Sequence, residues 1–128
     1  MSEIPSDLFY TEEHEYLKPT DDENVFVVGI TDYAQGELGD VVFVELPDTG
    51  VTLDRMEVFG TIEAVKAVND LYCPLRGEVV DVNADLADDP SLVNSDPYGN
   101  GWMIRLKVED PSEVQSLLGS DGYAEHVG

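Results

Sequence analysis

Cysteine and histidine are scarce in this chain, and their scarcity excludes several kinds of site. The 128 residues include one cysteine, Cys73, and two histidines, His14 and His126. A single thiol cannot form an internal disulfide, which agrees with a reducing compartment. Three such side chains are too few for a tetrahedral zinc site built from nitrogen and sulfur. Because Cys73 stands beside Pro74 in a strand-like run, we expect it to be small, buried packing, not a nucleophile activated by histidine.

Basic residues are also few. Six lysines and arginines stand against 28 aspartates and glutamates, so the net charge at pH 7 is −22. Most of such a surface repels nucleic acid and anionic membranes, and we expect neither as a partner. The acidic residues are spread from Glu3 to Glu125. This spread favours adaptation to a salt-rich cytosol, where screening relieves self-repulsion, over a local surface that seeks basic partners.

Long hydrophobic runs are absent as well. No apolar run approaches the roughly 20 residues that a membrane helix needs. The segment Met1–Asp7 lacks the basic start and apolar middle of a signal peptide. We therefore expect a soluble, cytoplasmic protein.

The sequence also lacks the common motifs of a self-contained active site. Its glycines stand singly, so no phosphate-binding loop is indicated. The run from Asp81 to Asp85 resembles the start of a calcium loop, but Leu86 and Leu92 occupy the positions of the required glycine and the final glutamate. We therefore expect no metal site and a protein that is not an enzyme.

Many short apolar runs are typical of an all-β protein. Strands are expected over residues 25–30, 41–46, 57–65, 68–73, 77–82 and 102–108, and 11–17 alternates enough to suggest another. In the last run, Trp102, Ile104, Leu106 and Val108 are expected on one face, and Met103, Arg105 and Lys107 on the other. Residues 84–101 are polar and rich in turn formers, so we expect them to wrap the surface. Two similar segments begin at Gly39 and Gly77 and suit a sandwich of two related halves.

Short helical segments complete the expected fold. One is expected over 33–38, capped by Thr31 or Asp32 and stopped by Gly39. Another should open at a capping box that begins with Asp110 and run to 118, and a third should cover 120–127. We expect a single domain over 1–128, with a flexible arm at 1–7, a β-sandwich core at 8–108 and C-terminal helical segments at 110–127.

The most informative stretch surrounds Lys66. Two apolar runs are joined tightly enough there for a hairpin with the lysine at its tip, and Lys66 is the only cation between Arg55 and Arg76. Its neighbours Val65 and Ala67 leave the ammonium uncrowded, so an enzyme could enclose it. An isolated lysine is usually a solvated surface group, but this arrangement favours a protruding modification site.

The same stretch resembles the lipoylation segment of glycine cleavage system H proteins. The resemblance is carried by Glu63-Ala64-Val65-Lys66-Ala67, Asp70, Tyr72, Pro74, Gly77-Glu78-Val79-Val80 and Val82-Asn83. Further matches, in the family's order, are His14-Glu15, Gly29 to Gln35, Gly39 to Pro47, Leu92 to Tyr98 and Gly101 to Met103. The resemblance spans about residues 8–125. It implies a lipoyl-domain-like barrel-sandwich hybrid of short antiparallel strands with short helices.

The resemblance also implies a function. (R)-lipoate would be bound covalently to Lys66 by a lipoate ligase or lipoyl transferase. The carrier would then serve three enzymes: the pyridoxal-phosphate-dependent glycine decarboxylase, the tetrahydrofolate-dependent aminomethyltransferase and the flavin-dependent dihydrolipoyl dehydrogenase. It would shuttle the aminomethyl group of glycine between the first two and electrons to the third. A carrier that visits several enzymes is best monomeric, so we expect a monomer.

Three further residues match positions near the resting cleft of the lipoyl arm. Glu15 and Asp70 match acidic positions of the family, and His14 is adjacent to Glu15. They could hold the loaded amine by charge-assisted hydrogen bonds; alternatively, Glu15 and Asp70 only add to an acidic surface. Tyr16 occupies a place where the family usually has tryptophan, and Ala64 one where it often has serine.

Other functions stay open at this point. Biotinylation usually requires methionine on both sides of the lysine, and Val65 and Ala67 do not fit that pattern. A lipoyl carrier could instead hand lipoate on to 2-oxoacid dehydrogenases. A third alternative is an unmodified, acidic β-sandwich that binds proteins, for which Lys66 would be dispensable.

Overall fold

The computed structural model describes residues 4–127, whose regular elements are mainly short strands. The strands are β1 (Phe9–Tyr10), β2 (Glu15–Pro19), β3 (Val25–Ile30), β4 (Val41–Glu45), β5 (Thr52–Leu53), β6 (Val58–Ala64), β7 (Val68–Tyr72), β8 (Gly77–Val82) and β9 (Ile104–Val108). The helices are α1 (Asp32–Leu38), α2 (Asp85–Asp88), α3 (Leu92–Ser95), the 3₁₀ helix η1 (Pro111–Ser116) and α4 (Ser120–Val127). None of these helices is long and apolar enough to cross a membrane.

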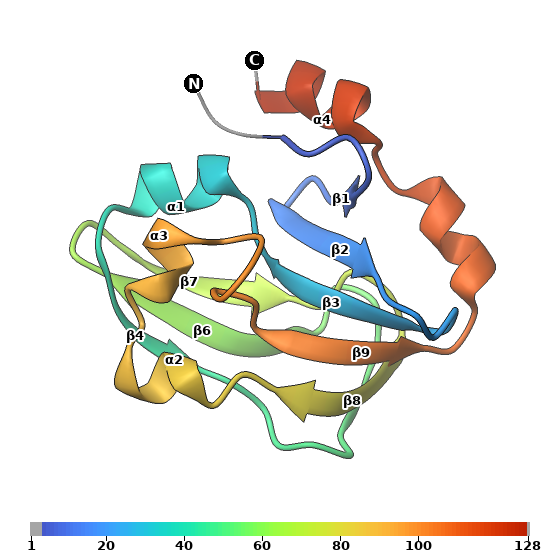
Figure 1. Ribbon diagram of the computed structural model, residues 1–128, viewed down its shortest axis with the longest axis horizontal. Helices are drawn as coiled ribbons and strands as arrows, with labels where there is room; N and C mark the ends of the chain where they lie inside the picture. The colour runs from blue at the N-terminus through green and yellow to red at the C-terminus, as the bar shows by residue number, and fades with distance from the viewer. Residues whose placement is uncertain (1–3, 128) are drawn as a thin grey trace.

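The strands form two antiparallel sheets that pack face to face (Figure 1). One sheet has the order β1-β2-β3-β9-β8-β5 and the other the order β4-β6-β7. A single large core cluster draws on both, with Val28 and Leu106 from the larger sheet and Ile62 and Leu71 from the smaller. The two similar sequence segments lie in β4 and β8, and hence in different sheets. The expected mainly-β sandwich with short helices is confirmed.

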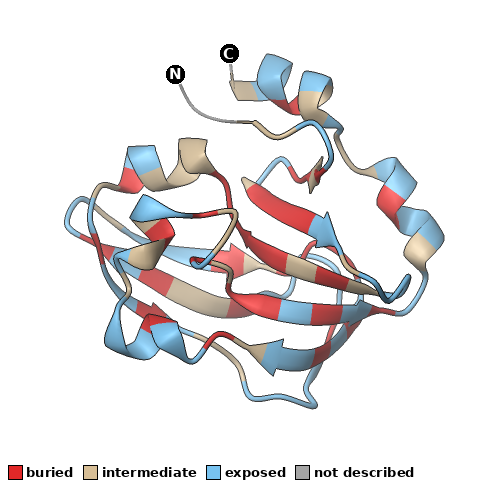
Figure 2. Cartoon of the chain, viewed as in Figure 1, coloured by how far each residue is buried: buried red, intermediate tan, exposed pale blue. Residues whose placement is uncertain are grey.

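The start of the last strand differs from the sequence prediction. Burial alternates along β9 as expected from its period of two (Figure 2). Met103, however, is buried, and the Arg105 guanidinium lies 5.2 Å from the centroid of the Trp102 ring. The predicted faces of Trp102 and Met103 were therefore wrong. Both residues precede the first residue of β9, Ile104, so their side chains do not follow the strand's alternation.

Residues 84–101 do more than wrap the surface. They contain α2 and α3, whose Leu86 and Val93 are fully buried in the main core. The Asn94 side chain reaches across to the loop before β4. Its Oδ1 accepts from the Val41 backbone N–H at 2.8 Å, and its Nδ2 donates to the Gly39 carbonyl at 2.9 Å. The sequence prediction missed this because the apolar residues are isolated among polar ones.

A second, smaller core lies under the C-terminal helix. It consists of Leu8, Tyr10, Tyr16 and Tyr123, and Ile4 packs against it. The buried Tyr16 ring lies against Gly29, its partner on β3, where an added Cβ would stand 2.7 Å from the Tyr16 hydroxyl oxygen. That hydroxyl donates to the Pro97 carbonyl at 2.6 Å. Tyrosine therefore fills this site with its polar end satisfied.

Segments near both ends of the described chain pack at this second core, at Ile4 and at Val127. In the segment predicted as a flexible arm, the Pro5 carbonyl accepts a hydrogen bond from the Tyr10 hydroxyl at 2.5 Å, and residues 1–3 lie outside the described residues. The expected helix after Asp110 is the 3₁₀ helix η1. Its cap differs from the predicted box, because the Asp110 carboxylate accepts from the Ser112 backbone N–H. The helix over 120–127 is confirmed as α4.

Candidate functional site

Lys66 lies at the tip of the β6–β7 hairpin, which is the loop at the left edge of Figure 1. Glu63 is paired with Val68, and the Ala64 backbone N–H donates to the Ala67 carbonyl at 2.8 Å. This leaves Val65 and Lys66 as the two residues at the turn. Both side chains are exposed. The predicted position of the lysine at an exposed hairpin tip is confirmed.

The end of α1 braces the lysine. The Thr31 side chain caps the start of this helix, and the helix ends at Gly39, whose φ is +80°. A Cβ added at Gly39 would stand 3.3 Å from Cδ and Cε of Lys66. The aliphatic part of the Lys66 side chain therefore packs against the backbone of Gly39. The Val65 backbone N–H also donates to the Asp40 carbonyl at 3.0 Å. The hairpin tip is thus fastened to the body.

The ammonium group itself is unengaged. In the part of the chain that the structure describes, Lys66 Nζ has no hydrogen bond or ion pair. By contrast, the exposed Arg76 pairs with both Asp54 and Glu109. The stem of Lys66 is held while its amine is available, which is the arrangement that attachment of a group to the amine requires.

A hollow of about 220 Å³ opens beside this anchor. Its lining comes from the turn before β2, β3, α1, β6 and β7, and consists of His14, Ile30, Tyr33, Ala34, Glu37, Leu38, Ile62, Asn69, Asp70 and Leu71. Leu38 directly precedes the glycine against which Lys66 packs. The wall is largely apolar, with a histidine, an amide and two carboxylates among its polar groups. It can shelter an apolar chain that ends in a cation.

Glu15 lies behind this hollow and not on its wall. Its side chain is only 2% exposed. Its carboxylate accepts hydrogen bonds from the Thr11 hydroxyl at 2.8 Å and from the Tyr72 backbone N–H at 3.4 Å. Burial raises the pKa of Glu15 to about 8, although both hydrogen bonds act in the opposite direction. The alternative that Glu15 only adds to an acidic surface was therefore wrong, because this carboxyl is buried.

His14 belongs to a network that the sequence did not reveal. It has a positive φ of 71°, and its Nδ1 lies 2.8 Å from the Tyr123 hydroxyl. The same hydroxyl lies 2.7 Å from the hydroxyl of Thr31, the cap of α1. The His126 ring centroid lies 5.7 Å from that of His14. Burial lowers the pKa of His14, and the charge of His126 lowers it further.

Comparison with known proteins identifies this arrangement. A family model described as glycine cleavage H-protein matches residues 8–128. The chain belongs to the glycine cleavage H-protein family. A glycine cleavage system H protein from Mycolicibacterium gilvum is 54% identical over 130 residues, covering 99% of this chain and 98% of the relative. One from Alteromonas mediterranea is 51% identical over 127 residues, with 99% and 98% covered.

The fold agrees with a solved member of the family. The crystal structure of a glycine cleavage system H protein from Mycobacterium marinum matches with a TM-score of 0.88 at 39% identity, covering 98% of this chain and 99% of that one. This confirms the expected lipoyl-domain-like barrel-sandwich fold. As an H-protein family member, the chain is a non-catalytic lipoyl carrier of the glycine cleavage system.

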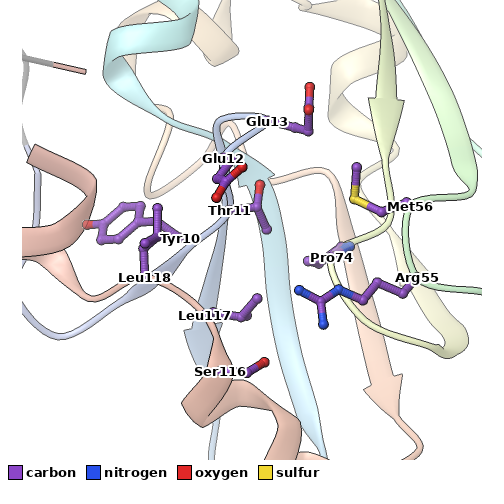
Figure 3. A pocket seen from close by; sticks show the side chains of 10 residues that line it. All are labelled: Tyr10, Thr11, Glu12, Glu13, Arg55, Met56, Pro74, Ser116, Leu117 and Leu118. Carbon is purple, nitrogen blue, oxygen red and sulfur yellow. The ribbon is translucent and has the colours of Figure 1, made fainter. Parts of the chain in front are cut away.

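The structure has a second hollow, of about 210 Å³ (Figure 3). Its lining comes from β1, the turn before β2, the loop before β6, Pro74, the end of η1 and the segment before α4, and consists of Tyr10, Thr11, Glu12, Glu13, Arg55, Met56, Pro74, Ser116, Leu117 and Leu118. Lys66 lines neither hollow, but the first includes His14 and Leu38, the residue before Gly39, whereas the second includes none of these. In this H-protein family member, the hollow beside Lys66 is therefore the candidate cleft.

The residues missed by sequence reasoning are those that support His14. Tyr123 is 109 residues from His14 and 92 from Thr31. No local spacing signals contacts across such a separation. The helix over 120–127 was predicted, but not the contacts by which its Tyr123 joins the turn before β2 to the cap of α1.

Proposed function

We propose that Lys66 is the residue that bears lipoate, attached to its ε-amine as an amide. The observation that carries this proposal is an exposed, unengaged amine at a hairpin tip whose stem is braced by Gly39. The residues present fit the group. The adjacent hollow has apolar walls for an acyl chain, and polar groups at His14, Asn69 and Asp70 for a charged end.

The arm serves as a shuttle between separate active sites. When bound, lipoate supplies a dithiolane that carries the one-carbon cargo and electrons. A group tethered through the long lysine and acyl chains reaches a high effective concentration in any active site at which the carrier docks. The partners in this proposal are glycine decarboxylase, aminomethyltransferase and dihydrolipoyl dehydrogenase, and a lipoate ligase or lipoyl transferase loads the lysine.

Glu15 and Asp70 stabilise the amine of the aminomethyl cargo, with His14 beside them. Asp70 and His14 line the hollow, and the Glu15 carboxyl bonds to the backbone of Tyr72, two residues from Asp70 on β7. With a pKa of about 8, Glu15 keeps its proton on most molecules at neutral pH. A nearby ammonium favours the ionised carboxylate. Because Glu15 does not line the hollow, it acts on the cargo through the β7 backbone to which it is bonded.

Lifetime measurements test this stabilisation. The loaded carrier should lose its cargo faster in a Glu15→Gln, Asp70→Asn double variant than in the wild type. The cargo is lost by hydrolysis, and both the exclusion of water and the pairing of the amine slow that reaction. An unchanged lifetime would refute the role of the two carboxyl groups and leave attachment at Lys66 unaffected.

Genetic complementation tests the carrier function. In a host strain that lacks the endogenous carrier, the wild-type chain should restore glycine degradation and Lys66→Arg should not. Lys107→Arg is the matched control, because Lys107 is an exposed lysine on β9 in the larger sheet. Rescue by Lys66→Arg would refute the proposal. If the wild-type chain instead restored growth that depends on 2-oxoacid dehydrogenases, without restoring glycine degradation, the result would support a lipoate relay.

A further inference from the structure

Large hydrophobic side chains are exposed on both sides of Lys66. Among residues 4–127, the two most exposed are Val65, at 72%, and Val68, at 66%. On the neighbouring strand β4, Val42 and Phe43 are both exposed, Phe43 to 50%. Exposed apolar side chains gathered in one place are typical of interaction sites, whereas isolated ones need no explanation.

Strand register places these side chains together. Phe43 on β4 is paired with Glu63 on β6, and Glu63 is paired with Val68 on β7. Paired residues of antiparallel strands project from the same face. Phe43 and Val68 therefore flank Glu63 in one row that runs across the smaller sheet just below the hairpin tip. We call Val42, Phe43, Glu63, Val65 and Val68 the tip face.

A bulge creates the apolar part of the tip face. The register of β4 shifts between Val41 and Phe43. Strict alternation would turn Phe43 to the side of the buried Val41, but the extra residue leaves Val42 and Phe43 both outside. The bulge in β4 thus exposes Phe43 on the same small sheet that carries Lys66 at its hairpin tip.

Apart from Lys66 itself, the charges around the tip face are negative. Glu45 and Asp70 lie in the next row of the same outer face, on either side of Thr61, and both are exposed. β4, β6 and β7 contain no lysine or arginine. A partner that covers the tip face must bring cations to these carboxylates, because leaving them desolvated and unpaired would be costly.

We propose that the tip face is the docking surface for the enzyme that attaches lipoate. That enzyme presents an apolar centre within a rim of lysine and arginine. The proposal rests on attachment at Lys66, and it adds where the modifying enzyme binds. The enzyme must bind the unmodified amine of Lys66. Exposed apolar side chains lie next to this lysine in sequence, at Val65, and across the smaller sheet, at Phe43. Docking there brings the amine to the active site without rearrangement of the hairpin.

Steady-state lipoylation of the intact chain tests the apolar contact. The host's lipoate-attaching enzyme is supplied with lipoate and ATP, and the product is measured by intact mass. The double variant Phe43→Ser, Val68→Thr should raise KM at least about tenfold with kcat little changed, because apolar area that docking would bury is lost. Val68→Thr alone keeps the β-branched shape and should raise KM by a few-fold, roughly in proportion to the smaller area.

Val80→Thr is the matched control for these changes. Val80 is 40% exposed and lies on β8 in the larger sheet, so its replacement should leave KM unchanged. A KM for the double variant within about twofold of the wild type would overturn the proposal, as would an equal effect of Val80→Thr. A fall in kcat at constant KM would also overturn it, because that result indicates a displaced lysine and not weaker docking.

The charged rim has a separate test. Glu45→Gln with Glu63→Gln should raise KM at low salt and reduce the salt dependence of KM, since screening weakens the attraction of the wild type. An unaltered salt dependence would overturn the basic rim. If the wild-type chain receives no lipoyl group at Lys66 at all, the proposed function itself fails. If it is lipoylated normally and the tip-face variants are too, only the docking surface fails.

Discussion

The buried carboxyl of Glu15 makes the stability of this protein depend on pH in a predictable way. Glu15→Gln removes the ionisable group and keeps a side chain of the same shape. The new amide oxygen can accept from the Tyr72 backbone N–H, and the amide nitrogen can donate to the Thr11 hydroxyl. The hydrogen bonds seen in the structure therefore have equivalents in the variant.

The sign and size of the effect follow from the shifted pKa. Burial raises the pKa of Glu15 from an ordinary 4.5 to about 8, so between these values the folded state binds more protons than the unfolded state. The free energy of unfolding is then fully retained below pH 4.5 and falls as the pH rises toward 8. Each pH unit in this window lowers it by about 1.4 kcal/mol, and the whole window by at most roughly 5 kcal/mol.

Urea unfolding at constant salt, followed by far-ultraviolet circular dichroism between pH 5 and 9, measures this effect. Between pH 5 and 9, the free energy of unfolding of the variant should rise by several kcal/mol relative to that of the wild type. The other carboxyl groups are common to both proteins, so their titration cancels in this difference. Glu12→Gln, at an exposed neighbouring position, should show no such gain. A difference between Glu15→Gln and wild type that is constant with pH would refute a buried, proton-retaining carboxyl.

Four further predictions concern the backbone and the surface charge. Gly39→Ala should lower the free energy of unfolding by about 1–2 kcal/mol in urea titrations, owing to its positive φ and its contact with Lys66. Gly36→Ala, in open helical space, should be neutral or gain up to about 1 kcal/mol. Gly29→Ala should cost about 2–4 kcal/mol in the same titrations, because Tyr16 must move. The melting temperature of the wild type should rise from low to molar salt, and indifference to salt would contradict salt adaptation.

Local sequence signals were sufficient for the elements that carry the lysine. Two apolar runs with room for only two residues between them require a hairpin, so the exposed tip at Lys66 was predictable. Thr31 and Gly39 mark the ends of α1 because a hydroxyl cap and a glycine at positive φ satisfy the backbone at helix termini. The resemblance to the H-protein family extended these local predictions to the whole fold.

Contacts between distant segments were not predictable in the same way. The burial of Glu15 depends on packing of the start of β2 against β7, and the acidic residues just before it, Glu12 and Glu13, are exposed. Tyr123 reaches His14 only because α4 folds back over β1. The exposure of Phe43 results from a bulge, and the sequence gives a bulge no distinct pattern when every residue concerned is valine or phenylalanine.

The account depends most directly on what Lys66 carries in the cell. Intact-mass measurement of protein purified from its native host, followed by fragmentation to locate the modified residue, tests this in one experiment. The account predicts a single lipoyl amide, and that the fragments place it on Lys66. Host-made protein with only the unmodified mass, or with its adduct on another lysine, would contradict the account.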